Sequence, residues 1–141
     1  MYTRLAVVAS LVVLSASTLA AQPPRPALQK GNTVLLAGYK CQADQLGRAD
    51  ALVDEIAAPI LNKHVSAGRL IAWGYTGVYI GDQVNRQIYV WATDPVALVQ
   101  ARQVYNPEIQ ANTKFAEFVR LCGSATISVH NLLTVSAPAA K

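Results

Sequence analysis

The chain of 141 residues is long enough for one domain with a hydrophobic core, and its 52% apolar content argues against a disordered protein. Charged residues make up only 14% of the sequence, and the net charge of +4 is spread along it without a run of lysine or arginine. A nucleic-acid-binding surface needs clustered basic side chains, so nucleic acid is not an expected partner.

The N-terminus has the composition of a signal peptide. A positive charge within residues 1–4 precedes an apolar core at residues 5–14, and residues 15–21 are mostly small. We predict a signal peptide over residues 1–20, with cleavage after Ala20 or one residue later. An apolar core of about 10 residues cannot cross a bilayer, which needs about 20. The expected location is therefore periplasmic or secreted, with no membrane span once the signal is removed.

The rest of the chain divides into a lead-in, one domain and a short tail. Three prolines within residues 22–30 predict an extended lead-in over residues 21–31. The domain is expected at residues 32–135, and residues 136–141 are expected to form a flexible tail. Its first element, residues 33–41, is a compact apolar run that predicts a strand. Apolar side chains occur at odd and even positions of this strand, so both faces of the sheet should be covered.

Residues 44–68 predict an amphipathic helix, which Gly68 ends. His64 lies near the C-terminal end of this helix, where we expect it to cap terminal carbonyl groups. The predicted apolar stripe recurs every three or four residues and consists of Ala49, Leu52, Val53, Ile56, Ala57, Ile60, Leu61 and Val65.

Residues 70–92 contain both tryptophans and three of the six tyrosines. They predict two strands, at residues 70–80 and 86–92, joined by a short loop at residues 81–85. Because side chains alternate across a strand, we assign the small, aliphatic even positions of both strands to the face that packs against helices. The odd positions then form an aromatic face, which is expected either to bind a ligand or to pack in a dimer interface. Its candidate residues are Trp73, Tyr75, Tyr79, Tyr89 and Trp91.

Asp94 and Pro95 predict the start of a second helix, as N-cap and first helical residue. Pro107 is expected to interrupt this helix before a further helical piece that runs from about residue 112 to Cys122. Gly123 is expected to end that piece.

Residues 125–135 predict the last strand, with aliphatic side chains at odd positions. Ser128 and His130 occupy its more polar positions, so we expect both on the aromatic face. The element order β-α-β-β-α-β predicts a ferredoxin-like α+β fold, with a four-stranded antiparallel sheet and helices on one face.

In this element order and in its two-sided strands, the chain resembles the dimeric α/β-barrel superfamily, in which two such sheets pack face to face around a central cavity. The resemblance covers about residues 32–135. The segment ADALVDEIAAPILNKHVSAGR, followed by AWGY, is also similar to small uncharacterised secreted bacterial proteins. The superfamily resemblance implies a homodimer, and among the activities that it hosts are cofactor-independent monooxygenation and isomerisation. No motif carries a catalytic residue of the superfamily over to this chain.

The two cysteines are expected to form a disulfide. Cys41 ends the first strand and Cys122 precedes the fourth, and in the predicted topology these ends of two antiparallel neighbours lie together. An even cysteine count in a secreted chain favours a bond, and a reactive or metal-binding thiol pair is the alternative.

His130 is the candidate catalytic residue, as a general base in the cavity, and the alternative is a structural histidine at the dimer seam. Ser128 joins the aromatic residues as a candidate ligand-binding or interface residue. Gly74, Gly77 and Gly81 form no phosphate-binding pattern, and two distant histidines form no metal site, so neither cofactor nor metal is expected. Three functions remain open: a homodimer that binds a small apolar or aromatic molecule, an enzyme of the superfamily type, and an interaction protein without a small ligand.

Overall fold

The computed structural model describes residues 28–78 and 83–133. The predicted signal peptide, most of the lead-in, Tyr79 and the predicted tail lie outside these residues. The described elements are β1 (Thr33–Tyr39), a short 3-10 turn η1 (Ala43–Gln45), α1 (Leu46–Ser66), β2 (Ala72–Gly77), β3 (Arg86–Ala92), α2 (Pro95–Gln110), α3 (Phe115–Cys122) and β4 (Thr126–Asn131).

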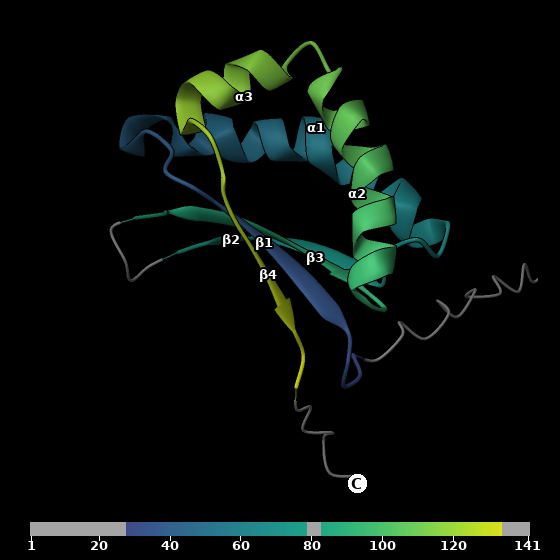
Figure 1. The fold of residues 1–141 in the computed structure, drawn as a ribbon. Coiled ribbons are helices and arrows are strands. Elements are labelled where there is room, and N and C mark those ends of the chain that lie inside the picture. The colour runs from purple at the N-terminus through teal and green to yellow at the C-terminus, as the bar shows by residue number, and fades with distance from the viewer. Residues whose placement is uncertain (1–27, 79–82, 134–141) are drawn as a thin grey trace, which may run out of the picture.

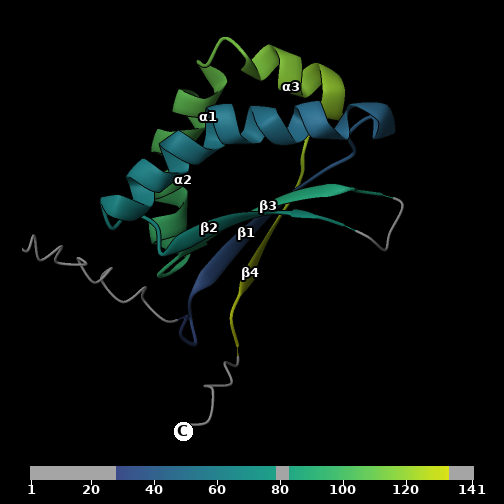
Figure 2. The same ribbon diagram turned by 180° about the vertical axis from the view of Figure 1, so that it is seen from behind.

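The strands form one sheet in the order β2-β3-β1-β4, and every neighbouring pair is antiparallel. The three α-helices lie on one side of this sheet, as Figures 1 and 2 show from opposite directions. The first strand lies between the third and the fourth, which confirms the predicted ferredoxin-like α+β fold.

The core lies between the sheet and the helices. Leu35 of β1 and Val90 of β3 are paired across the sheet and are 4% and 1% exposed. Leu52 and Leu61 of α1 are fully covered above them, and Leu98 of α2 is 2% exposed in the same cluster. Burial of such side chains is the main source of stability, at about 1.5–3 kcal/mol for each one. We call this side of the sheet the helix side.

The predicted helix ends are confirmed, but the predicted interruption of α2 is wrong. The Asp94 carboxylate accepts a hydrogen bond from the backbone N–H of Ala97, and Gly68 follows α1 with a positive φ of 70°. Pro107 lies inside α2, which continues to Gln110. The residue before a proline is disfavoured in a helix but not excluded. Packing of Tyr105 and Ile109 against the core offsets this cost, since tertiary contacts supply most helical stability in proteins.

The predicted division of residues 70–92 by parity is wrong for β2. Trp73 pairs with Val90 and Tyr75 pairs with Ile88, so odd positions of β2 share a face with even positions of β3. Because Val90 belongs to the core, Trp73 and Tyr75 lie on the helix side. The predicted loop of residues 81–85 has an odd length and would place equal parities on one face. The observed pairing of Gly77 with Arg86 leaves an even number of connecting residues, at positions 78–85.

The opposite face of the sheet, which we call the open face, combines apolar and polar side chains. The Tyr89 ring lies over Gly74, where a Cβ atom would collide with it. Val84 lies over Gly38 in the same way. Described residues with side chains on this face are Val34, Leu36, Ala72, Thr76, Gln87, Tyr89, Trp91, Thr126, Ser128 and His130.

Candidate ligand-binding pocket

A pocket of about 360 Å³ lies between the helices and the sheet on the helix side. Its floor is formed by β1 and β3, and its walls come from α1, α2, α3 and the connection between α3 and β4. We call it the helix-side pocket. This volume lies within the range of about 300–1,000 Å³ that small-molecule sites occupy. Most of the lining is apolar, including Leu35, Ala37, Val53, Ile56, Ala57, Ile88, Ile109, Phe115 and Phe118.

Two phenols and one guanidinium interrupt this apolar lining. Tyr39 comes from the end of β1, and Arg102 and Tyr105 come from neighbouring turns of α2. Tyr105 is 5% exposed and its ring lies edge-on against His64, with centroids 6.0 Å apart. The Tyr39 ring packs against Phe118 at 5.1 Å. Packing therefore holds both phenols in place.

The polar ends of these three side chains are unpaired. Among the described residues, none forms a hydrogen bond or ion pair with the Tyr39 or Tyr105 hydroxyl or with the Arg102 guanidinium. Burial raises the pKa of Tyr39, and it raises the pKa of Tyr105 to about 12. The positive charge of Arg102 acts against both shifts and lowers the pKa of each phenol in part. At neutral pH the phenols stay protonated and can donate hydrogen bonds.

Polar side chains also mark the opening of the pocket. Gln110 and Ser124 are exposed, and Asn106 is half-buried. Ile127 of β4 lines the same region and is 45% exposed. The pocket thus has an apolar interior and a mixed entrance, which is a common arrangement for a small-molecule site.

The aromatic residues predicted as one site lie on two faces of the sheet. Trp73 Nε1 donates to the Asn62 side-chain oxygen at 2.8 Å, and the Tyr75 hydroxyl donates to Asp50 Oδ1 at 2.8 Å. Both contacts attach α1 to β2 on the helix side, and neither aromatic residue lines the pocket. Tyr79 lies outside the described residues.

The remaining predicted residues come together on the open face. His130 and Trp91 both pair with Val34, from opposite sides of β1, and Ser128 and Tyr89 flank Leu36 in the same manner. His130 Nε2 and Ser128 Oγ are 3.0 Å apart, and both side chains are exposed. None of these four side chains lines the helix-side pocket. The catalytic role of His130 remains a prediction.

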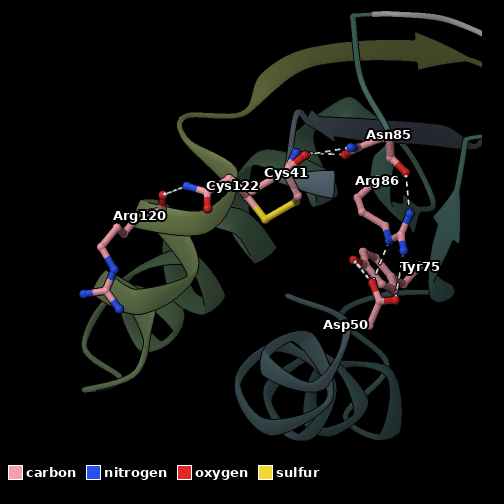
Figure 3. Close-up of a disulfide and its surroundings, with 8 residues drawn as sticks. Cys41, Asp50, Tyr75, Asn85, Arg86, Arg120 and Cys122 are labelled. Atoms are coloured by element: carbon pink, nitrogen blue, oxygen red, sulfur yellow. Dashed lines mark hydrogen bonds and ion pairs between the residues drawn. A yellow bond between two sulfur atoms is a disulfide. The ribbon is translucent and has the colours of Figure 1, made fainter. Parts of the chain in front are cut away.

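Cys41 and Cys122 form the predicted disulfide (Figure 3). Cys41 lies between β1 and η1, and Cys122 is the last residue of α3. The Asn85 side chain brackets Cys41, because its Oδ1 accepts from the Cys41 N–H and its Nδ2 donates to the Cys41 carbonyl, both at 2.8 Å. The backbone N–H of Gln42 also donates to the Leu121 carbonyl. These contacts fix α3, which forms one wall of the pocket.

A charged cluster lies beside the disulfide (Figure 3). Arg86 donates to both carboxylate oxygens of Asp50, at 2.6 and 3.0 Å, and Tyr75 donates to the same carboxylate. The Arg86 guanidinium lowers the pKa of Asp50. A second, more open hollow is lined in part by these three residues, but their charges are already paired. The cluster is therefore better suited to joining α1, β2 and β3 than to holding a ligand.

The described residues offer no metal site. Within residues 28–78 and 83–133, no group of three or more His, Cys, Asp or Glu side chains could hold a metal ion. In the same part of the chain, no helix is both long and apolar enough to cross a membrane.

Tyr39, Arg102 and Tyr105 are not among the site residues predicted from the sequence, although α2 carries a signal for two of them. Arg102 and Tyr105 are three residues apart, and Ile109 follows four residues later. This spacing places all three on one side of a helix, so it puts an arginine within an otherwise core-facing stripe. An arginine within such a stripe would have predicted a charged side chain beside the apolar core, which is where the pocket lies.

No family model and no curated protein matches the sequence. Among solved structures, the chain is similar to a dimeric ferredoxin-like protein from an uncultured marine organism, with 12% identity and a TM-score of 0.60 over 79% of this chain and 95% of that chain. It is also similar to an uncharacterised NIPSNAP-like domain protein from Burkholderia xenovorans, with 17% identity and a TM-score of 0.52 over 78% and 92% of the two chains. A NIPSNAP family protein of unknown function from Agrobacterium tumefaciens gives 17% identity and a TM-score of 0.51 over 77% and 95%. Identities this low establish a shared fold alone, and the chain therefore has the ferredoxin-like α+β fold of these proteins.

Proposed function

We propose that this protein is a periplasmic or secreted homodimer that binds a small apolar molecule in the helix-side pocket of each protomer. The observation that carries this proposal is the pocket of about 360 Å³ with its largely apolar lining. Removing apolar ligand surface from water contributes about 25 cal/mol per Å², so such a lining favours an apolar ligand. The resulting site differs from the cavity expected on the aromatic face, because it lies on the other side of the sheet.

The proposed location rests on the sequence of the N-terminus and is consistent with the disulfide. Residues 1–20 have the charge and apolar core of a signal peptide. The Cys41–Cys122 bond belongs to an oxidising compartment, such as the periplasm or the exterior of the cell.

The proposed homodimer rests on the open face. This face carries Trp91, Tyr89, Val34 and Leu36, and none of the described helices covers it. Such an apolar and aromatic face is typical of an interaction surface. The similar protein from an uncultured marine organism is dimeric, which fits the same assembly. A second copy on the open face would leave the helix-side pocket accessible in both protomers.

Binding is the activity that the pocket chemistry supports best. The described lining contains no carboxylate, imidazole or thiol, and its two phenols have a raised pKa. The described lining therefore provides hydrogen-bond donors and apolar surface, which suit binding, and it contains no side chain that would act as a general base at neutral pH. His130 would act on a ligand only at the open face, within a dimer.

A neutral fluorescent probe tests the pocket directly. N-phenyl-1-naphthylamine becomes fluorescent in apolar surroundings, and we expect one molecule to bind per protomer. Ala57 lines the pocket and is 4% exposed, so Ala57→Phe should fill the space and weaken probe binding at least about tenfold. Fluorescence titration of the purified, oxidised protein measures both affinities.

Ala116→Phe is the matched control, because Ala116 lies on α3 with an exposed side chain outside the pocket lining. This variant should bind the probe as the wild type does, and circular dichroism should show that both variants are folded. Equal affinity of the wild type and the folded Ala57→Phe variant would place the probe elsewhere and contradict the proposed site. Absence of probe binding would favour an interaction protein without a small ligand.

A further inference from the structure

The described lining of the helix-side pocket contains one positive charge, that of Arg102. Arg102 is half-buried on the pocket-facing side of α2, and no described carboxylate pairs with it. Arg48 and Arg86, by contrast, each form an ion pair with a carboxylate at 2.8 Å or less. A cation in the lining of a largely apolar pocket favours an anionic partner there, because an unpaired charge is costly in apolar surroundings.

The two phenols provide further donors near this charge. Tyr105 is 5% exposed and lines the pocket, and no described residue forms a hydrogen bond with its hydroxyl. Tyr39 lines the same pocket in the same unpaired condition. Arginine is always protonated, and phenols with a raised pKa stay protonated as well. Among the described residues, none accepts a hydrogen bond from these three groups, so an acceptor on a bound ligand would suit them.

On the basis of the proposed function, we propose that the ligand is a small organic acid whose apolar part fills the pocket and whose carboxylate accepts hydrogen bonds from Arg102, Tyr39 and Tyr105. The planar guanidinium fork matches the two oxygens of a carboxylate. A singly charged head group balances the single positive charge of the lining. A phosphate group would bring a second negative charge into a largely apolar space, which is unfavourable.

The test compares an acid with an alcohol of equal chain length. Decanoate and decanol are each titrated against the probe-bound wild-type protein at pH 7.5, and the two displacement constants are compared. We expect decanoate to bind at least about tenfold more tightly, since hydrogen bonds to a charged acceptor are stronger than those to a neutral one. Arg102→Met should reduce this preference to less than about twofold while decanol binding persists. Tyr105→Phe should weaken decanoate binding and leave decanol binding nearly unchanged.

Arg120→Met is the control for the loss of one positive charge. Arg120 is exposed on α3 and does not line the pocket, so this variant should keep the wild-type preference for the acid. Arg102→Lys keeps the charge without the guanidinium fork and should show an intermediate preference.

The outcomes separate the two proposals. Equal affinity for decanoate and decanol, or failure of both to displace a bound probe, would overturn the organic-acid inference and leave the apolar site in place. A preference for the acid that survives in Arg102→Met would overturn the role of Arg102. Failure of the wild type to bind the probe at all would instead overturn the proposed function.

Discussion

His64 is a completely buried titratable side chain near the C-terminal end of α1. Its Nδ1 accepts a hydrogen bond from Arg69 Nε at 3.0 Å, and its Nε2 lies 3.8 Å from Glu108 Oε1 without a hydrogen bond. Burial lowers the pKa of His64, the charges of Arg69 and Lys63 lower it further, and Glu108 offsets part of the shift. The expected capping of helix carbonyls is wrong, because the imidazole turns toward Arg69 and the core.

This environment predicts that the protein loses stability in mild acid. The lowered folded-state pKa means that the unfolded chain binds the proton more readily. The contribution of neutral His64 is complete above the unfolded pKa of about 6.5 and is lost as the pH falls below it. We expect the free energy of unfolding to fall between pH 7.5 and pH 5.5, as measured by urea denaturation.

His64→Gln removes the titrating group and should flatten this pH dependence. Val99→Gln is the control, because Val99 is 56% exposed on α2 and this variant leaves His64 in place, so it should keep the wild-type slope. The carboxylates whose pKa is lowered, such as Asp50 and Glu117, act at lower pH and do not affect this interval. Parallel curves for the wild type and His64→Gln would exclude His64 as the cause.

The disulfide connects the segment that follows β1 to α3, and its two cysteines are 81 positions apart in the sequence. A bridge that closes a loop of this length restricts the unfolded chain and contributes about 4 kcal/mol in the chain-entropy model. The double variant Cys41→Ala/Cys122→Ala should therefore lower the free energy of unfolding by about 2–5 kcal/mol. Urea denaturation of the variant and of the oxidised wild type measures the difference.

The same variant should loosen α3 more than the rest of the fold. Phe115 and Phe118 of α3 line the pocket, so hydrogen exchange should increase first in residues 115–122. Unchanged denaturation midpoints, together with unchanged exchange, would show that the neighbouring contacts of Asn85 and Gln42 hold these elements without the bond.

The order of elements could be predicted from the sequence, because hydrophobic periodicity and the signals at Asp94, Pro95, Gly68 and Gly123 act locally. The assignment of β2 side chains to the two faces of the sheet could not be predicted, because it depends on the register of β2 with β3. The loop signal near Gly81 predicted a connection with an odd number of residues. The observed pairing of Gly77 with Arg86 leaves an even number, and it reverses the assignment of every β2 side chain.

The same limit applies to the candidate site. The predicted residues of β3 and β4, such as Trp91 and His130, do share a face, because their parity followed from core positions in single strands. The helix-side pocket depends on how closely three helices pack against the sheet, which no periodicity determines. Arg102 and Tyr105 are visible as a helical stripe, but their convergence with Tyr39 requires the tertiary structure.

At the scale of the whole molecule, the proposed dimer and the proposed pocket occupy opposite sides of the sheet and should be separable. Trp91 lies on the open face, so Trp91→Asp would bury a charge in the interface and should convert the dimer to a monomer. Val99→Asp is the control, because Val99 is 56% exposed on α2 and lies on the helix side. Size-exclusion chromatography with light scattering should show half the wild-type mass for the first variant alone.

The monomeric Trp91→Asp variant also tests whether each protomer holds a complete site. The described floor and walls of the helix-side pocket come from β1, β3 and the helices of the same protomer, so we expect the monomer to bind one probe molecule with nearly the wild-type affinity. A wild-type monomer, or a Trp91→Asp variant that stays dimeric, would contradict assembly through the open face. Loss of probe binding in a folded monomer would instead mean that the partner shapes the pocket, because subunit contacts would then have to fix the position of the helices or of β4.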